Sequence, residues 1–257
     1  MKKSVDVHYE LTGPADAPVL VLAGPLGTTL DIWDPQVEAL SEQFRMLRYD
    51  HRGHGGSPVP TGPYSMEDLT VDVVTLLDRL EIEQAAFCGL SLGGMVGIWL
   101  AAHAHDRVSS LVLCSTSAQF GDPQPWHERG SVVRWAGTVS IADEVVERWF
   151  TPDWAAKNPE QVERAKQMIA NTNDEGYASC CTAIAALQGL RLLGRILAPT
   201  LVIAGKQDPA IPVNPHAEIL ANGIAGAKLK VLDAAHVVTV EQADTVNDLI
   251  AQHITAG

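Results

Sequence analysis

The stretch Gly89-Leu90-Ser91-Leu92-Gly93 follows an apolar segment, Ala85–Cys88, and precedes a second one rich in small residues, Gly94–Ala102. Its G-x-S-x-G pattern is typical of a nucleophile elbow, a sharp turn from a strand into a helix that exposes the central side chain. The two glycines remove side chains that would clash in this turn, and glycine tolerates unusual backbone angles. The pattern therefore predicts that Ser91 is a nucleophile. The alternative is that Ser91 only caps the helix.

Strand-like and helix-like segments alternate on both sides of this turn. Such alternation predicts an α/β fold with a mostly parallel central sheet and helices on both faces. Helical spacing of apolar residues is clear from Met66 to Leu80, and a closing helix is expected at Ala243–Ile254. The other expected strands are Val5–Leu11, Pro18–Ala23, Phe44–Asp50, Val108–Ser115, Thr200–Gly205 and Lys228–Leu232.

Residues 120–195 interrupt the alternation. They contain no strong strand pattern and hold four of the six tryptophans, at positions 126, 135, 149 and 154. An all-helical insertion after the carboxyl end of a parallel strand would lie over the elbow, because open sheets place their sites at that edge. We therefore predict a core domain made of residues 1–119 and 196–257, and a helical cap made of residues 120–195.

Composition limits the classes of partner. The formal net charge of −13 argues against nucleic acid, which requires clustered cations, but it does not exclude a small anionic substrate. No segment approaches the roughly 18 apolar residues of a membrane helix. The start of the chain, Met1–Asp6, lacks the apolar region of a signal peptide, so no membrane partner and a cytoplasmic location are expected. A homo-oligomer stays open.

The four cysteines have neither disulfide-framework nor zinc spacing, so buried free thiols are expected. No metal or other cofactor is expected.

A serine nucleophile needs a general base and an acid that orients the base. The elbow predicts the chain order serine, acid, histidine. Asp208 follows the expected strand Thr200–Gly205, and His236 follows the expected strand Lys228–Leu232. We predict Asp208 as the acid and His236 as the base. The alternatives are that Asp208 is an ordinary turn residue before a proline and that His236 caps a helix.

Other residues of the same types fit these roles less well. Asp233 lies only three residues before His236, too close along the chain to orient it. No acid follows the expected strand Val108–Ser115. His51 and His54 belong to a glycine-rich loop beside the elbow, where a structural role is favoured over catalysis.

The oxyanion formed during acyl transfer needs preorganised hydrogen-bond donors. One is expected to be the backbone N–H of Leu92, directly after the nucleophile. The second should come from the loop Gly24-Pro25-Leu26-Gly27-Thr28 after an early strand. Pro25 has no N–H, so Leu26 is the preferred donor.

With these residues in place, the whole chain resembles the α/β-hydrolases, and within them the 3-oxoadipate enol-lactonases (β-ketoadipate enol-lactone hydrolases). The Arg52-Gly53-His54-Gly55 loop and the elbow are general to the fold. The segments more particular to the lactonases are Cys88-Gly89-Leu90-Ser91 and Arg148-Trp149-Phe150-Thr151-Pro152. Two segments depart from the family pattern: Gly24-Pro25 before the first helix, and Val237-Val238-Thr239 after the base.

The resemblance implies a role in aromatic catabolism and a substrate with a free carboxylate beside an enol-lactone ring. Trp126 and Arg129, one helical turn apart in the expected cap, would then contact the substrate, because a guanidinium binds a carboxylate through two hydrogen bonds. The alternatives are cap-core packing for Trp126 and a surface ion pair for Arg129. Arg134 is a weaker candidate, and Trp149 is expected in the cap core.

The expected reaction is hydrolysis through an acyl-enzyme on Ser91. Three other functions stay open at this point. They are hydrolysis of another small ester or lactone, a cofactorless oxidoreductase or perhydrolase activity, and ligand reception without catalysis.

Overall fold

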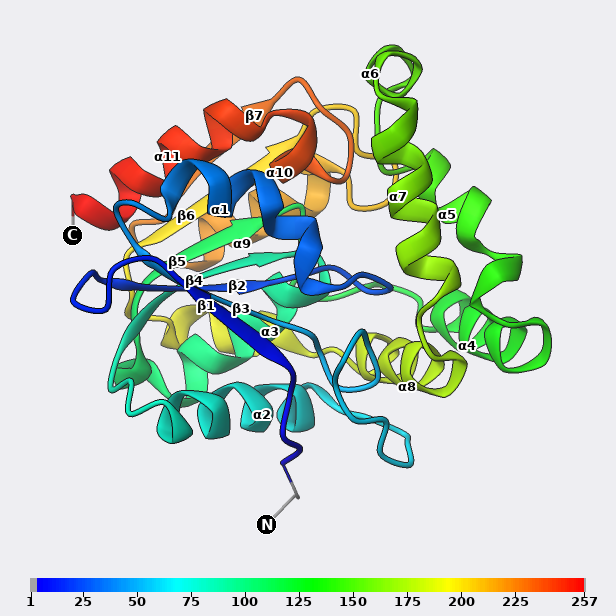
Figure 1. Ribbon diagram of the computed structural model, residues 1–257, viewed down its shortest axis with the longest axis horizontal. Helices are drawn as coiled ribbons and strands as arrows, with labels where there is room; N and C mark the ends of the chain where they lie inside the picture. The colour runs from blue at the N-terminus through cyan, green and yellow to red at the C-terminus, as the bar shows by residue number, and fades with distance from the viewer. Residues whose placement is uncertain (1–3, 257) are drawn as a thin grey trace.

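The computed structural model describes residues 4–256, which build a seven-stranded sheet (Figure 1). The strand order is β1-β3-β2-β4-β5-β6-β7. Neighbouring strands pair in parallel except β1 and β3, which pair antiparallel. The strands are β1 (Tyr9–Thr12), β2 (Val19–Ala23), β3 (Arg45–Tyr49), β4 (Ala85–Leu90), β5 (Val108–Cys114), β6 (Thr200–Gly205) and β7 (Lys228–Leu232).

Helices cover both faces of this sheet, as predicted. α2 (Met66–Arg79) and α3 (Leu92–His103) lie on one face, and α1 (Asp34–Leu40) and α11 (Ala243–Thr255) lie on the other (Figure 1). The central strands β4 and β6 are buried along their whole length, since helices cover them from both sides. The remaining core helices are η1 (Leu30–Trp33), η2 (His105–Arg107), η5 (Val213–Ala217), α9 (Glu218–Gly223) and α10 (Val238–Glu241).

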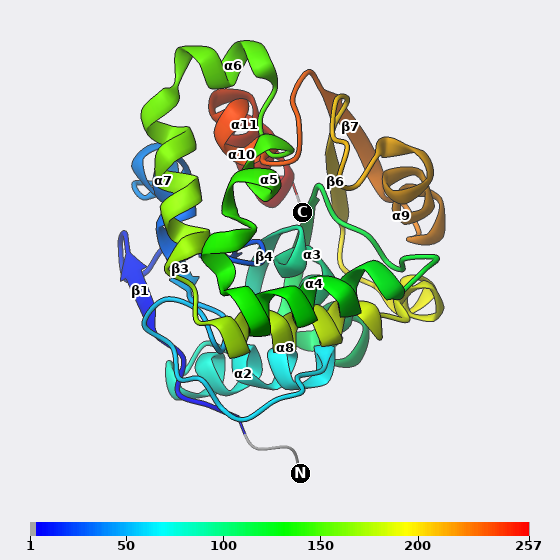
Figure 2. The ribbon, with the colours of Figure 1, turned by 90° about the vertical axis from the view of Figure 1, so that its right-hand side faces the viewer.

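Every regular element between β5 and β6 is helical. We call these elements, from α4 to η4, the helical insertion. Figure 2 shows α4, α5 and α8 in front of the edge of the sheet. The elements are α4 (Gln124–Ala136), η3 (Thr138–Ser140), α5 (Ala142–Glu147), α6 (Pro152–Lys157), α7 (Pro159–Ala170), α8 (Asp174–Ala185) and η4 (Gly189–Arg195).

The first strand is shorter than predicted. It pairs with β3 only from Tyr9 onward, whereas the Val5 N–H donates to the Asp72 carboxylate at 2.8 Å. The Asp72 side chain of α2 therefore binds the start of the segment Val5–Leu11, which the sequence predicts as a strand.

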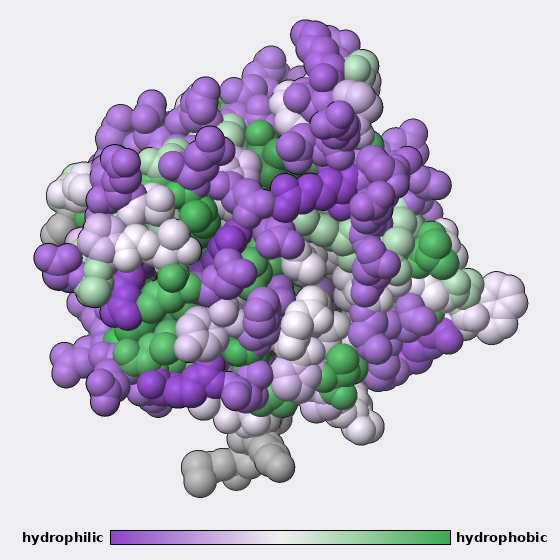
Figure 3. Space-filling view, viewed as in Figure 1, coloured by the Kyte–Doolittle hydropathy of each residue, from purple (hydrophilic) through white to green (hydrophobic). Residues whose placement is uncertain are grey.

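Three further properties concern the cysteines, the surface and the helices. The four cysteines are free and buried, as expected. Hydrophilic side chains dominate the face drawn in Figure 3, in keeping with the strongly acidic composition. Within residues 4–256, no helix combines the length and the apolar character that a bilayer crossing requires.

Candidate active site

The elbow between β4 and α3 holds Ser91 in an uncommon backbone conformation. Ser91 has φ 54° and ψ −112°, and such angles cost a non-glycine residue on the order of 1–3 kcal/mol. Neither Gly89 nor Gly93 has a positive φ. The glycines are needed for space, because a Cβ on Gly93 would lie 2.0 Å from the Ala23 carbonyl oxygen. The sequence pattern led us to expect unusual backbone angles at the glycines. The residue that has such angles is Ser91.

Asp208 and His236 meet beyond the carboxyl ends of β6 and β7. The Asp208 Oδ2 atom lies 2.8 Å from His236 Nδ1, and both residues are buried. The other oxygen, Oδ1, accepts the backbone N–H groups of Ala210 at 2.8 Å and Ile211 at 2.9 Å. Three hydrogen bonds therefore fix the carboxylate, and the carboxylate fixes the imidazole with Nε2 left for another partner. Asp233 is instead exposed and accepts from Gln207.

Ser91 and His236 line the same cavity. Within residues 4–256 the Ser91 hydroxyl makes no hydrogen bond to another protein group. Catalytic hydrogen bonds are often long in the absence of substrate and tighten in the reacting complex, so this geometry is compatible with a serine–histidine pair.

The loop after β2 brings a second set of backbone groups to the elbow. Leu92 is the first residue of α3, and the first N–H groups of a helix have no intrahelical acceptor. Gly27 is unsuitable as an oxyanion donor, because its N–H donates to His54 Nε2 at 3.0 Å. The Gly24 carbonyl oxygen accepts the Gly93 N–H at 3.0 Å and so joins this loop to the elbow. Both Pro25 and Leu26 line the cavity.

His51 and His54 hold this loop from behind. His51 Nε2 lies 3.0 Å from the Gly24 carbonyl oxygen, so it is the protonated nitrogen of that ring. Burial lowers the pKa of His51 to about 3 and the pKa of His54 to about 4. Both rings are therefore neutral at physiological pH, as His54 must be to accept from Gly27. The favoured structural role for these residues agrees with this geometry.

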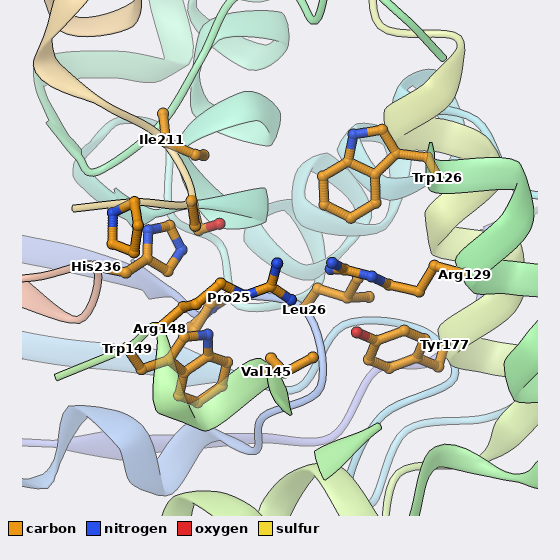
Figure 4. A pocket seen from close by; sticks show the side chains of 13 residues that line it. Pro25, Leu26, Trp126, Arg129, Val145, Arg148, Trp149, Tyr177, Ile211 and His236 are labelled. Atoms are coloured by element: carbon orange, nitrogen blue, oxygen red, sulfur yellow. The ribbon is translucent and has the colours of Figure 1, made fainter. Parts of the chain in front are cut away.

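The cavity between the elbow and the helical insertion has a volume of about 150 Å³, which suits a small ligand. Trp126 and Arg129 enter it from α4, as Figure 4 shows, with the guanidinium 4.9 Å from the indole ring. No aspartate or glutamate lines the cavity within the described part of the chain. The lining residues are Pro25, Leu26, Ser91, Trp126, Arg129, Val145, Arg148, Trp149, Tyr177, Pro209, Ala210, Ile211 and His236.

The arginines of the insertion differ in their partners. Arg134, the weaker candidate, is not among the residues that line the cavity and pairs with Glu175 at 2.8 Å. Across residues 4–256, no carboxylate forms an ion pair with Arg129. The alternative that Arg129 forms an ion pair at the surface is therefore wrong. An unpaired cation in a cavity without acids creates a local field that attracts anions, whatever the net charge of the chain.

Several lining residues were not predicted. Arg148 directly precedes Trp149 in a segment that the sequence analysis used only for the family resemblance. Tyr177 lies on α8 and is almost completely buried. Trp149 is buried as expected for cap core, at 4% exposure, but it also lines the cavity.

We call residues 233–237, which follow β7 and include His236, the histidine loop. The buried carboxylate of Glu241 links this loop to the helical insertion. Its Oε2 accepts the Ala235 N–H at 2.9 Å, and its Oε1 accepts the Thr151 hydroxyl. The Val237 N–H donates to the Trp149 carbonyl oxygen at 2.9 Å. The residues on both sides of His236 are thus hydrogen-bonded, directly or through Glu241, to the segment that follows α5.

Comparison with known proteins identifies the family of the chain. The family model of the alpha/beta hydrolase fold matches residues 17–243. The chain is 40% identical over 248 residues to 3-oxoadipate enol-lactonase 2 from Acinetobacter baylyi, covering 96% of this chain and 92% of the relative. It superposes on the crystal structure of the enol-lactonase from Burkholderia xenovorans LB400 with a TM-score of 0.95 and 42% identity, covering 98% and 97% of the two chains.

A more distant relative points to a neighbouring chemistry. The chain is 31% identical over 260 residues to a protein from Stutzerimonas stutzeri whose name assigns it provisionally to carbamate hydrolysis, covering 96% of each. The resemblance predicted from sequence motifs is confirmed.

Proposed function

Because the chain belongs to the α/β-hydrolase fold family, we propose that it opens 3-oxoadipate enol-lactone to 3-oxoadipate. One observation carries the proposal: Ser91 and His236 share a cavity with the unpaired guanidinium of Arg129 and with no carboxylate from the described chain. A cavity of this kind suits an ester or lactone that carries a negative charge.

In the first half of the reaction, His236 Nε2 accepts the proton of Ser91 as the serine oxygen attacks the lactone carbonyl carbon. Asp208, held by two backbone N–H groups, keeps Nδ1 protonated and stabilises the imidazolium. The N–H groups of Leu92 and Leu26 stabilise the oxyanion. The carbon–oxygen bond of the ring then breaks and expels an enolate, which needs less acid assistance than an alkoxide. The enolate oxygen takes the proton from His236 Nε2, which leaves an enol and a neutral imidazole. The enol becomes a ketone by tautomerisation.

In the second half, His236 removes a proton from water, which attacks the acyl carbon and displaces Ser91. The serine oxygen recovers its proton from His236, and the product leaves as a carboxylate. The same oxyanion donors serve both tetrahedral intermediates.

Arg129 and Trp126 recognise the carboxylate that the lactone already carries. The guanidinium carbon of Arg129 lies 4.9 Å from the centroid of the Trp126 ring, and the guanidinium N–H groups can donate two hydrogen bonds to the carboxylate. We assign these residues to a cap made of residues 120–195, over a core domain of residues 1–119 and 196–257, because all the regular elements from α4 to η4 are helical.

The test is a substrate panel combined with active-site labelling. The enol-lactone is expected to be turned over with a higher kcat/KM than an uncharged lactone of the same ring size. A fluorophosphonate probe is expected to label Ser91, as peptide mass spectrometry would detect. Labelling without enol-lactone turnover would favour another small ester, a lactone or a carbamate as substrate. Absence of labelling would contradict a serine hydrolase and favour a receptor that binds a ligand without catalysis. Peroxide-dependent turnover would indicate a perhydrolase.

A further inference from the structure

A second guanidinium faces the first across the cavity. Arg129 enters from α4, on the side of Trp126 and Tyr177, whereas Arg148 enters from the end of α5, on the side of His236 (Figure 4). Both side chains extend toward the middle of the cavity and line it. Recognition of one carboxylate by Arg129 leaves Arg148 without a role.

The one carboxylate bound to Arg148 within the described residues is a weak competitor. Glu144 lies one helical turn earlier, with its Oε1 atom 3.1 Å from Arg148 Nη2. The Glu144 side chain is 73% exposed, and exposed pairs at this spacing contribute about 0.3–0.5 kcal/mol. A guanidinium has five N–H donors, so Arg148 retains donors for a ligand in the cavity.

The buried hydroxyl of Tyr177 lies within reach of both cations. Burial raises the pKa of Tyr177, and the positive charges of Arg129 and Arg148 oppose this rise. The hydroxyl therefore stays protonated at physiological pH, and its proton is available to a ligand in the cavity that Tyr177 lines. The cavity thus offers two cations and a hydroxyl, and no acid from the described chain lines it to neutralise them.

We propose that Arg129 and Arg148 form a two-cation site for dicarboxylates, which binds the product of hydrolysis with one carboxylate on each guanidinium. This inference rests on the proposed function, because the charges of substrate and product follow from it. The lactone carries one carboxylate. Hydrolysis breaks its acyl carbon–oxygen bond, adds the oxygen of water to that carbon and releases a proton, which leaves a second carboxylate.

The two cations have separate partners in this arrangement. Arg129 holds the carboxylate present from the start. Arg148, which enters beside His236, meets the carboxylate that forms at Ser91. Product inhibition and selectivity for dicarboxylates over monocarboxylates follow from this division.

The experiment measures inhibition of an uncharged chromogenic ester, p-nitrophenyl butyrate. Adipate, a six-carbon dicarboxylate, is expected to compete with the ester at a lower inhibition constant than hexanoate, which has one carboxylate. Arg148→Met is expected to raise the inhibition constant of adipate about tenfold or more, equivalent to about 1.4 kcal/mol, and that of hexanoate less than about threefold. Arg134→Met, on α4 but bound to Glu175, is the matched control and should change neither constant.

Equal inhibition by adipate and hexanoate in the unmodified protein would overturn the inference. An equal shift of both constants in Arg148→Met would also overturn it. If that variant does not fold, as judged by its thermal unfolding, Arg148→Gln makes the same comparison while keeping a polar side chain. Turnover of the enol-lactone without discrimination between the acids would refute only this inference. Discrimination without enol-lactone turnover would refute only the proposed substrate.

Discussion

The sheet and the helical insertion differ in how they hold the residues that face the cavity. Asp208 and His236 follow strands, are 4% exposed, and are joined to each other and to backbone groups by hydrogen bonds. Arg129 lies on α4 and Arg148 directly follows α5; both are only partly buried, and within residues 4–256 Arg148 pairs with the exposed Glu144 while Arg129 has no carboxylate partner. Groups that transfer protons are thus positioned by the protein, whereas groups that bind charge are left for a ligand to position.

We therefore expect substitutions in the two regions to have different effects on the kinetics of hydrolysis. Substitutions in the loops that follow β4, β6 and β7 should lower the rate of the chemical step for every substrate. Changes in the insertion should alter discrimination between charged and uncharged substrates.

Ser91→Ala is expected to have the largest effect, because it removes the atom that forms the acyl-enzyme. We expect kcat to fall on the order of 10⁵–10⁶-fold for charged and uncharged substrates alike. Steady-state kinetics measure this loss, and an unchanged thermal unfolding temperature serves as the folding control. Activity near the original level would refute the assignment of the nucleophile.

Asp208→Asn is expected to lower kcat about 10³–10⁴-fold while KM changes little. The amide cannot stabilise the imidazolium, and its NH₂ group favours the wrong tautomer of His236. Asp233→Asn is the matched control, since that side chain is exposed and bonded to Gln207. A larger loss in the control would move the role of acid to Asp233.

Glu241→Gln tests the junction between the two regions. One of its oxygens becomes an NH₂ group that opposes the donors of Thr151 or Ala235, which should cost about 1–3 kcal/mol of unfolding free energy. We also expect kcat to fall about tenfold for every substrate, because the histidine loop loses a support. Chemical denaturation and kinetics measure the two effects. Glu42→Gln, an exposed position, is the control; equal effects in both variants would remove Glu241 from the junction.

Arg129→Met isolates charge recognition, since methionine keeps most of the aliphatic stem. The kcat/KM for the enol-lactone is expected to fall about 10–100-fold, and that for an uncharged ester less than about threefold. The comparison of the two substrates in one variant is its own control. Equal losses for both would show that Arg129 acts by packing and not by charge.

A further prediction concerns the pH dependence of stability. His51 and His54 have pKa values lowered by burial to about 3 and about 4, whereas the unfolded chain binds protons near pH 6.5. The unfolded state therefore binds more protons between these values, so the unfolding free energy falls as pH decreases from about 6.5 to about 4. Each histidine contributes a slope of at most about 1.4 kcal/mol per pH unit.

His54→Gln should flatten this dependence, and the glutamine oxygen can still accept from Gly27. Denaturant titrations at several pH values measure the slope. The exposed His103→Gln is the control. An unchanged slope in His54→Gln would show that His54 is not a source of the pH dependence.

The sheet and the helical insertion also differ in how well the sequence predicts the positions of their site residues. Ser91 and Asp208 each follow a run of apolar residues of strand length, and His236 follows the alternating segment Lys228–Leu232. Parallel strands bring their carboxyl ends to one edge. Local patterns therefore place all three at the same edge of the sheet. Arg148 and Tyr177 lie on or beside helices whose periodicity defines a buried face but not the cavity that this face lines. Their positions depend on packing between α4, α5 and α8, which no local pattern specifies.

The hydrogen bonds of Trp149 and Thr151 to the histidine loop have a consequence for directed evolution. Random libraries over α4 and α8 can alter substrate preference while leaving the proton-transfer machinery in place, because neither helix is bonded to that loop within residues 4–256. Libraries over residues 148–151 would vary preference and turnover together, so gains in one trait would be hidden by losses in the other. The chain thus separates its evolvable positions from its constrained ones at the end of α5.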